Sequence, residues 1–157
     1  MKEILKLVFA IAVCQTAGAI GSVFTSSAIS VWYEQLQKPA LTPPGWVFGP
    51  VWFLLYTLMG VSLYLVWRKR TAEHCQCTAL RVFFFQLTLN ILWSYLFFGL
   101  REPLLAFVEI LVLFLAILAT AWQFWNVSRM AAYLLMPYIL WVGLAAYLNF
   151  AIWQLNF

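Results

Sequence analysis

The sequence predicts an all-α integral membrane protein: a bundle of five transmembrane helices, with a long and partly helical first loop. Hydrophobic residues make up 66% of the 157 positions and charged residues only 9%, against about 25% charged in soluble domains. Five apolar runs are long enough to cross a bilayer. The basic residues form short clusters between these runs, a topological pattern rather than a nucleic-acid interface. We therefore expect the lipid bilayer, and not a nucleic acid, as partner.

The first span is expected at about residues 4–24, because roughly 21 residues at about 1.5 Å each match the hydrocarbon thickness of a bilayer. Its charged start and apolar middle resemble a signal peptide, but the apolar run is long enough to span. We interpret it as a retained helix, with cleavage after Ala19 as the alternative.

The other four spans are expected at about residues 47–67, 80–99, 104–124 and 130–153. The last three are joined by connections of a few residues, so they are expected to be antiparallel neighbours. The length of the chain allows a single domain, residues 1–157.

The basic residues also predict the orientation of the chain. Only Lys38 and Arg101 fall on one side of the spans, and the other side carries Lys2, Lys6, Arg68, Lys69, Arg70, Arg81 and Arg129. The positive-inside rule then places the N-terminus inside and the C-terminus outside. A bacterial inner membrane is the preferred location, with the mitochondrial outer membrane as the alternative.

The first loop, residues 25–46, is longer than a connection needs to be. Residues 31–37 are predicted to form a short helix, and the prolines that follow favour extended backbone. Two interpretations remain open from the residues alone. The loop is a lid, or it is an interfacial anchor carrying the aromatic-belt residues Trp32, Tyr33 and Trp46.

Polar side chains mark one face of the third span, where Gln86, Asn90 and Ser94 follow one another at intervals of four residues, with Trp93 beside them. Polar groups in hydrocarbon are costly, so this face is expected to point inward. It could bind the polar atoms of a ligand, or it could join helices by hydrogen bonds of around 1 kcal/mol; the second interpretation is preferred.

Aromatic residues mark similar faces on two other spans. The second span carries Phe48, Trp52, Tyr56 and Gly60, and the fifth carries Tyr138, Trp141, Ala145 and Leu148. If these faces meet the polar one, they enclose a cavity suited to a large, flat, apolar molecule with a few polar edges. The alternative is plain helix packing by bulky side chains.

Small residues at helical spacing predict close helix approach at two places. The clearer one lies on the first span (Cys14, Ala17, Gly18, Gly21 and Ser22), and a weaker one lies on the fourth (Ala116, Ala119 and Thr120). The partner of each is a neighbouring span or a second copy of the chain.

Two further groups invite a chemical interpretation. Glu109 is the only acidic residue deep in a span, and we expect it to be neutral or hydrogen-bonded to a facing helix rather than part of a proton relay. His74, Cys75 and Cys77 are too closely spaced for a tetrahedral metal site, so a solvated loop is preferred and no metal is expected.

Three runs of the sequence strongly resemble the TspO/translocator protein family: WYEQLQKPALTPPGWVFGPVWFLLY (residues 32–56), LNILWSYLFFG (89–99) and LLMPYILWVGLAAYLNF (134–150). The resemblance covers essentially the whole chain. It implies a five-helix bundle, commonly a homodimer, that binds porphyrins such as protoporphyrin IX, and in some members sterols or benzodiazepine-type ligands. It implies no obligatory cofactor, the porphyrin being a ligand.

The resemblance also implies where the ligand binds. The family's pocket lies beneath the first loop, which favours the lid interpretation. Together with the inward faces, it gives the expected ligand-binding residues Tyr33, Trp52, Tyr56, Asn90, Trp93, Ser94, Tyr138, Trp141 and Ala145. Light-dependent porphyrin degradation, proposed for some bacterial members, would assign a catalytic role to Trp52 and Trp141.

Two features depart from the pattern of the animal members. Phe150 and Gln154 stand where their sterol motif requires a Tyr followed by a basic residue, so sterol recognition is not expected. Glu109 stands where they carry Asp. The leading hypothesis is a porphyrin-binding sensory protein of tetrapyrrole homeostasis or stress regulation, and the alternatives are a porphyrin-degrading enzyme and a transporter of porphyrin, sterol or other lipid-like molecules.

Overall fold

The computed structural model describes residues 2–29, 31–69 and 73–157. Arg70 and the side chains of Lys2, His74 and Cys75, which entered the predictions above, lie outside what it describes. Regular structure in the described ranges is entirely helical, and five segments are long and apolar enough to cross a membrane. The predicted fold class is confirmed: the chain is a multi-pass integral membrane protein.

The helical elements are α1 (Lys2–Ile29), the 3₁₀ helix η1 (Tyr33–Gln35), α2 (Gly45–Trp67), α3 (Glu73–Ser94), the π-helical η2 (Tyr95–Gly99), α4 (Pro103–Val127), α5 (Arg129–Leu134) and α6 (Met136–Asn156). Each expected span lies inside an observed helical segment, and most segments extend beyond the expected ends, although α2 and η2 end at the expected residues. α1 continues five residues past its expected end, and there Thr25 Oγ1 donates to the carbonyl of Gly21 at 3.1 Å, which satisfies a hydroxyl within the helix.

The fifth span, predicted as one helix over residues 130–153, is two helices that meet at Leu135. Pro137 explains the break, since its ring lacks an N–H and clashes with the carbonyl four residues earlier in a continuous helix. The Leu135 N–H bonds instead to the carbonyl of Ala132 at 3.1 Å, a tighter turn than an α-helix makes.

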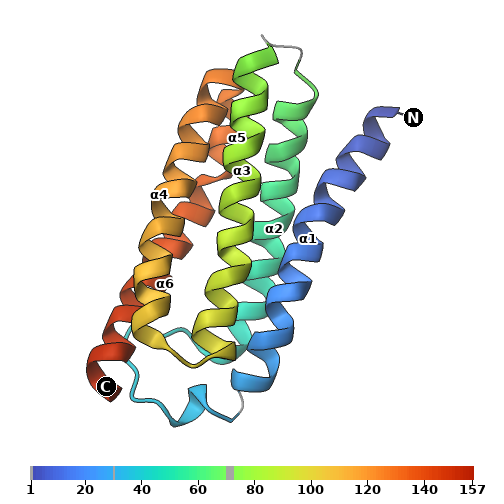
Figure 1. Cartoon of the computed structure of the whole chain (residues 1–157). Helices are drawn as coiled ribbons and strands as arrows, with labels where there is room; N and C mark the ends of the chain where they lie inside the picture. Colours follow the sequence, from blue (N-terminus) through green and yellow to red (C-terminus); the bar gives the residue numbers. More distant parts are fainter. Residues whose placement is uncertain (1, 30, 70–72) are drawn as a thin grey trace.

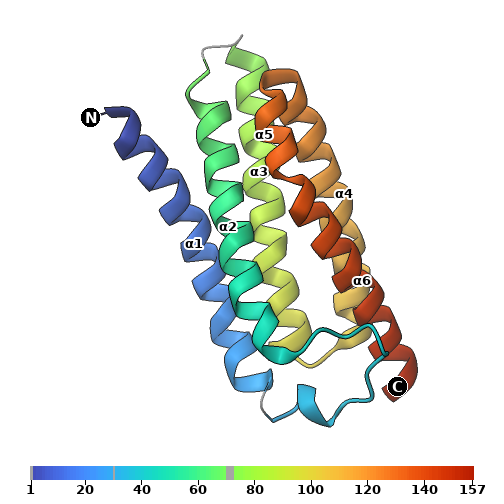
Figure 2. The same ribbon diagram turned by 180° about the vertical axis from the view of Figure 1, so that it is seen from behind.

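The five spans form an elongated bundle in which α2 and α3 are central (Figure 1). α1 packs against α2 and α3, and α4 packs against α3 and α6. The view from behind shows that the N-terminal half of α1 leans away from its neighbours, whereas its C-terminal half lies close to α2 (Figure 2). The chain between α1 and α2 crosses the end of the bundle where α6 also ends.

The outer surface of the bundle is apolar. Leu5 on α1, Leu115 on α4 and Leu140 on α6 are 73%, 65% and 75% exposed. Such a surface would be costly in water but is compatible with lipid chains. The spans therefore make contact with the bilayer.

At the end of the bundle opposite the first loop, polar contacts join the helix ends. Lys69 Nζ donates to the carbonyl of Val127 at 3.0 Å, which connects the end of α2 to that of α4. The Tyr64 hydroxyl donates to Glu3 Oε2 at 3.3 Å, which connects α2 to the start of α1. Among the described residues of the predicted basic side, Lys6, Arg68, Lys69, Arg81 and Arg129 lie in or directly after the parts of the helices nearer this end.

The first loop, called the lid below (residues 31–44), is mostly extended. The expected helix over residues 31–37 is only the single 3₁₀ turn η1, because Leu36 at its C-terminal end already adopts an extended backbone (φ −74°, ψ 144°) ahead of Pro39. The side chain of Asn156, at the end of α6, makes two bonds to the backbone of Gln37. It accepts from the Gln37 N–H at 2.8 Å and donates to the Gln37 carbonyl at 3.0 Å.

Candidate ligand pocket beneath the first loop

The three faces that the sequence singled out meet in the half of the bundle nearer the lid. Trp52 stacks on Tyr56 with ring centroids 5.5 Å apart, and its edge contacts Tyr138 of α6 at 6.4 Å. Phe48, one turn before Trp52, contacts Trp141 of α6 at 5.9 Å. The aromatic faces of α2 and α6 therefore converge, which is the condition that the predicted cavity required.

A chain of hydrogen bonds fixes this arrangement behind the pocket. The Tyr56 hydroxyl donates to Asn90 Oδ1, Asn90 Nδ2 donates to the Tyr138 hydroxyl at 2.8 Å, and that hydroxyl donates to Gln86 Oε1 at 2.9 Å. These bonds join α2, α3 and α6, so the interpretation of Gln86 and Asn90 as interhelical hydrogen-bonding residues is confirmed. Within the described part of the chain, Gln86 Nε2 has no hydrogen-bond partner.

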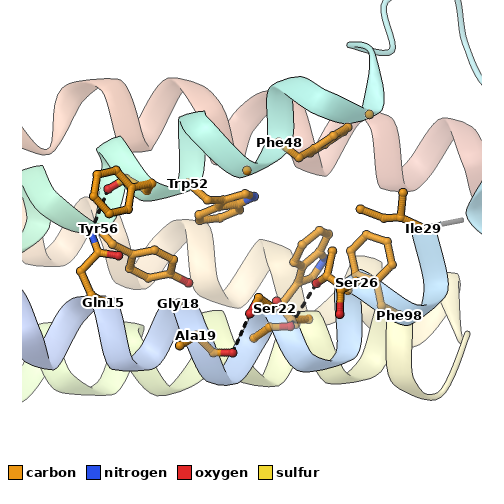
Figure 3. A pocket seen from close by; sticks show the side chains of 17 residues that line it. Gln15, Gly18, Ala19, Ser22, Ser26, Ile29, Phe48, Trp52, Tyr56 and Phe98 are labelled. Carbon is orange, nitrogen blue, oxygen red and sulfur yellow. Dashed lines mark hydrogen bonds between the residues drawn. The ribbon is translucent and has the colours of Figure 1, made fainter.

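The main cavity, of about 380 Å³, lies between α1, α2 and the end of α3 (Figure 3). Four of the predicted residues line it, namely Trp52, Tyr56, Trp93 and Ser94. A second, much smaller cavity of about 30 Å³ lies between the lid, η2 and α6, and Tyr33, Trp93 and Ala145 line it. Trp93 thus separates the two cavities. Its Nε1 donates to Asn149 Oδ1 of α6 at 3.0 Å, which fixes the plane of the indole.

The remaining predicted residues lie behind the cavity walls. Asn90 and Tyr138 are 1% and 0% exposed, and both are engaged in the chain of hydrogen bonds. Trp141 lines neither cavity and lies against Phe48, which does line both. The structure therefore brings the nine predicted residues into one region but divides them between cavity wall and support, and their binding role stays a prediction.

One wall of the main cavity was not predicted as a binding surface. It is formed by α1, whose lining residues are Gln15, Gly18, Ala19, Gly21, Ser22, Thr25, Ser26 and Ile29. The signal was present as the row of small residues on the first span, which we interpreted only as a packing face. Small residues also leave open space beside a helix. On α1 they allow close packing and also form a wall of the cavity.

Both small-residue faces are used largely within the chain. On α1, Cys14 and Ala17 are buried, and a Cβ atom placed on Gly18 would lie 2.5 Å from the Tyr56 ring. On α4, Ala116 and Thr120 are buried as well. A neighbouring span is therefore the partner of most of each face, and Cys14 acts as a small apolar residue.

The lid covers the end of the pocket with aromatic contacts. Tyr33 is 6% exposed, and its ring makes edge contacts with Phe48, Phe97 and Phe98 at 5.9 to 6.3 Å. Burial raises the pKa of the Tyr33 hydroxyl to about 12, so the residue stays neutral at physiological pH.

The two interpretations of the first loop each describe a different part of it. Trp32 is half-buried and contacts Phe97 at 5.7 Å, and Tyr33 is buried, so both belong to the lid. Trp46, which follows the lid at the start of α2, is 76% exposed and is the one suited to an interfacial position.

Glu109 does not line either cavity. It is buried on α4, and neither of its carboxylate oxygens has a hydrogen-bond partner among the described residues. The expected alternative of a hydrogen bond to a facing helix is therefore wrong. Among the described residues, no group of three His, Cys, Asp or Glu side chains is arranged to hold a metal ion.

The geometry of the main cavity suits one kind of ligand. Two indole rings and the Tyr56 ring offer flat apolar surfaces, and the α1 wall adds hydroxyl groups along one side. A flat, largely apolar molecule that carries a polar edge can stack on the rings and place that edge on the hydroxyls.

Comparison with known proteins agrees with this architecture. The model of the TspO/MBR family matches residues 10–154. The chain is 44% identical to the tryptophan-rich protein TspO of Archaeoglobus fulgidus, over 98% of this chain and 99% of the relative. It is 39% identical to the human translocator protein, over 87% and 82% of the two chains, and 34% identical to the tryptophan-rich sensory protein of Cereibacter sphaeroides, over 88% and 87%.

Proposed function

Since the chain belongs to the TspO/MBR family, we propose that it is a membrane-embedded binding and sensory protein whose ligands are porphyrins, such as protoporphyrin IX or haem-like tetrapyrroles, and related apolar molecules. The word "sensory" in the name of the Cereibacter sphaeroides relative supports this role. The binding event would report tetrapyrrole levels or stress.

The position of Trp52 is the observation that carries the proposal. Its indole lines the main cavity and is held on both sides, by stacking on Tyr56 and by edge contact with Tyr138. A rigid indole at a cavity wall is a preorganised stacking surface, so little conformational entropy is lost when a flat ligand binds to it. The cavity volume of about 380 Å³ lies within the range of about 300 to 1,000 Å³ typical of small-molecule sites.

The proposal includes a homodimer in a bacterial inner membrane, with the N-terminus inside. Because the small-residue faces of α1 and α4 are largely buried within one chain, the dimer contact would use another surface. The family resemblance, rather than a particular contact of this chain, supports the dimer.

The test is a titration of the protein with protoporphyrin IX, followed by quenching of tryptophan fluorescence. We expect Trp52→Phe to weaken binding about two- to twelvefold, because it removes part of the stacking surface, worth about 0.5 to 1.5 kcal/mol. Trp122→Phe is the matched control, since Trp122 is 70% exposed on α4 and lines neither of the two cavities. An unchanged affinity and unchanged quenching in Trp52→Phe would contradict the proposed site.

The same titration separates the two indoles that the resemblance pairs. Trp141→Phe should weaken binding less than Trp52→Phe, because Trp141 acts on the cavity through Phe48.

Two further experiments address the alternative functions. If illumination of the porphyrin complex yields a new pigment with the wild type and only bleaching with the Trp52→Phe, Trp141→Phe double variant, the enzyme hypothesis is favoured. Concentration-dependent uptake into proteoliposomes would favour the transporter hypothesis.

A further inference from the structure

We propose that the ligand enters the main cavity sideways from the hydrocarbon of the bilayer, through an opening between α1 and α2, while the lid stays closed. The inference rests on the proposed function for the identity of the ligand only. We call this the lateral opening and define it by the cavity-lining residues that are also exposed, namely Ala19, Ser22, Ser26, Gly45, Gly49 and Phe53.

The lateral opening faces lipid rather than water. Its residues belong to the segments of α1 and α2 that are apolar and long enough to span the membrane. The surface beside it carries large exposed apolar side chains: Ile20 and Val23 on α1 and Leu54 on α2. A cavity wall that is exposed among such residues is exposed to acyl chains.

Packing gives no reason for a glycine at position 49, inside α2, or at position 45, where α2 begins. A Cβ atom at Gly18 or Gly60 would lie 2.5 Å from the neighbouring helix, so both are needed for close approach. A Cβ atom at Gly49 would meet nothing within 4 Å. Glycine inside a helix costs about 0.5 to 1 kcal/mol relative to alanine, so its presence at an open position stabilises nothing. What it does provide is space, at the edge of the cavity.

In contrast to the lateral opening, the end of the pocket beneath the lid is closed. The Tyr33 ring fills the space beneath the lid against Phe48, Phe97 and Phe98. The double hydrogen bond between Asn156 and the backbone of Gln37 holds the lid to α6. Entry from water would require both sets of contacts to break, whereas entry from lipid requires neither.

The deeper end of the lateral opening is fixed by one polar contact. Gln15 Nε2 of α1 donates to the Phe53 carbonyl at 3.0 Å and to Thr57 Oγ1 at 2.9 Å. These bonds hold α1 against α2 one helical turn beyond Trp52. The opening is therefore confined to the part of the two helices between Gln15 and the lid.

The lining of the opening defines the class of ligand that can use it. Ser22 and Ser26 offer hydroxyls on the α1 side, and Trp52 offers a flat ring on the α2 side (Figure 3). A planar molecule that partitions into the bilayer and carries a polar edge can pass between them with its edge on the serines. Binding should then follow the concentration of ligand in the lipid rather than in the water.

The test compares a variant that fills the opening with a cross-link that closes the lid. Gly49→Leu adds a branched side chain to the opening, and Gly49→Ala is the matched control that adds only a methyl group. For the lid, Gln37→Cys and Asn156→Cys are joined by a bismaleimide in a chain whose native cysteines are replaced. Association of protoporphyrin IX is followed by stopped-flow quenching in lipid nanodiscs.

We expect Gly49→Leu to slow association of protoporphyrin IX by about tenfold, because the added side chain obstructs the route into the cavity. The association rate of Gly49→Ala should lie within about twofold of the wild-type rate. The rate of the cross-linked lid variant should lie within about twofold of the rate of the same variant before cross-linking. A cross-link that slows association more than Gly49→Leu does would overturn the inference.

A second measurement needs no porphyrin, so it separates failure of the entry route from failure of the proposed ligand. Lipids with brominated acyl chains quench indoles that they contact. The fluorescence lost on changing Trp52 to Phe identifies the contribution of Trp52, and we expect it to be quenched by these lipids in the wild type and protected in Gly49→Leu. If the Trp52 contribution is not quenched in the wild type, the opening does not admit molecules from the bilayer.

Discussion

Asn90 holds together three helices with one side chain. Its oxygen accepts from Tyr56 of α2 and its nitrogen donates to Tyr138 of α6. Asn90 is only 1% exposed, so a ligand would reach its amide only if the surrounding side chains moved. A buried hydroxyl without a partner costs about 1 to 3 kcal/mol, so the two bonds of Asn90 support the Trp52–Tyr56 stack in this structure.

The first prediction concerns the coupling within this network. Asn90→Leu should lower the free energy of unfolding by about 1 to 3 kcal/mol, because it leaves both tyrosine hydroxyls with fewer partners. In the background of Tyr56→Phe and Tyr138→Phe, the same change should cost clearly less, since no hydroxyl is then left behind. The double-mutant cycle is measured by thermal or denaturant unfolding in one detergent. Additive effects would show that the network stabilises nothing beyond its separate contacts.

At the scale of single residues, the sequence predicted which way a side chain faces better than which residue it forms a hydrogen bond with. The spacing of Gln86, Asn90 and Ser94 correctly indicated an inward face, because polar groups avoid lipid. It could not indicate that the donors and acceptors of Asn90 would be taken by two tyrosines, since that depends on the register of three helices. Glu109 shows the same limit. Its burial followed from its position in an apolar span, but its lack of a partner among the described residues did not.

At the scale of helices, α1 and α2 approach each other closely at two contacts, and in each contact only one of the two helices contributes a glycine. Gly60 of α2 lies against the backbone of Ile11, and Gly18 of α1 lies against the ring of Tyr56. These two contacts hold the middle of α1, from Ile11 to Gly18, on α2, next to the part of α1 that forms a wall of the pocket. The N-terminal end of α1 leans away, and its apolar residues are exposed to lipid.

The second prediction uses this contact. Gly60→Ala places a Cβ atom 2.5 Å from Ile11 Cα, and because a backbone atom cannot turn aside, the helices must separate. We expect a loss of about 1 to 3 kcal/mol in the free energy of unfolding and weaker porphyrin binding. Gly143→Ala is the control, since its Cβ atom would lie 3.6 Å from Phe114, an ordinary contact. Equal stability of the two variants in thermal unfolding would contradict the packing argument.

Some features of the helices could be predicted from the sequence and others could not, depending on what determines each feature. The positions of the spans follow from apolar length, which is a property of the sequence alone. The break at Leu135 could have been predicted from Pro137, because proline cannot continue the helix on its N-terminal side. The π-helical turn η2 could not. It turns Phe97 and Phe98 beneath the lid, and its geometry depends on the aromatic contacts made there.

At the scale of the whole molecule, charge and architecture divide the bundle into two unlike ends. One end carries the lid and the end of α6, and its basic residues are few. The other end carries Lys6, Arg68, Lys69, Arg81 and Arg129. The positive-inside rule assigns the second end to the inside, so the lid would face outward and the lateral opening would lie in the outer leaflet. This matters for function, since a ligand would then be drawn from that leaflet.

The last prediction tests this orientation with thiol labelling. Cys77 is exposed near the basic end, whereas Cys14 is fully buried and should not react. In a chain with Cys75→Ser, a membrane-impermeant maleimide should therefore label Cys77 in inside-out vesicles only. The companion variant carries Ala40→Cys in the exposed part of the lid, with Cys75→Ser and Cys77→Ser, and it should be labelled in right-side-out vesicles only. The reverse pattern would place the lid inside. Labelling of either site from both sides would mean that nine basic residues do not suffice to fix one orientation, and in that case the lateral opening would draw ligand from both leaflets.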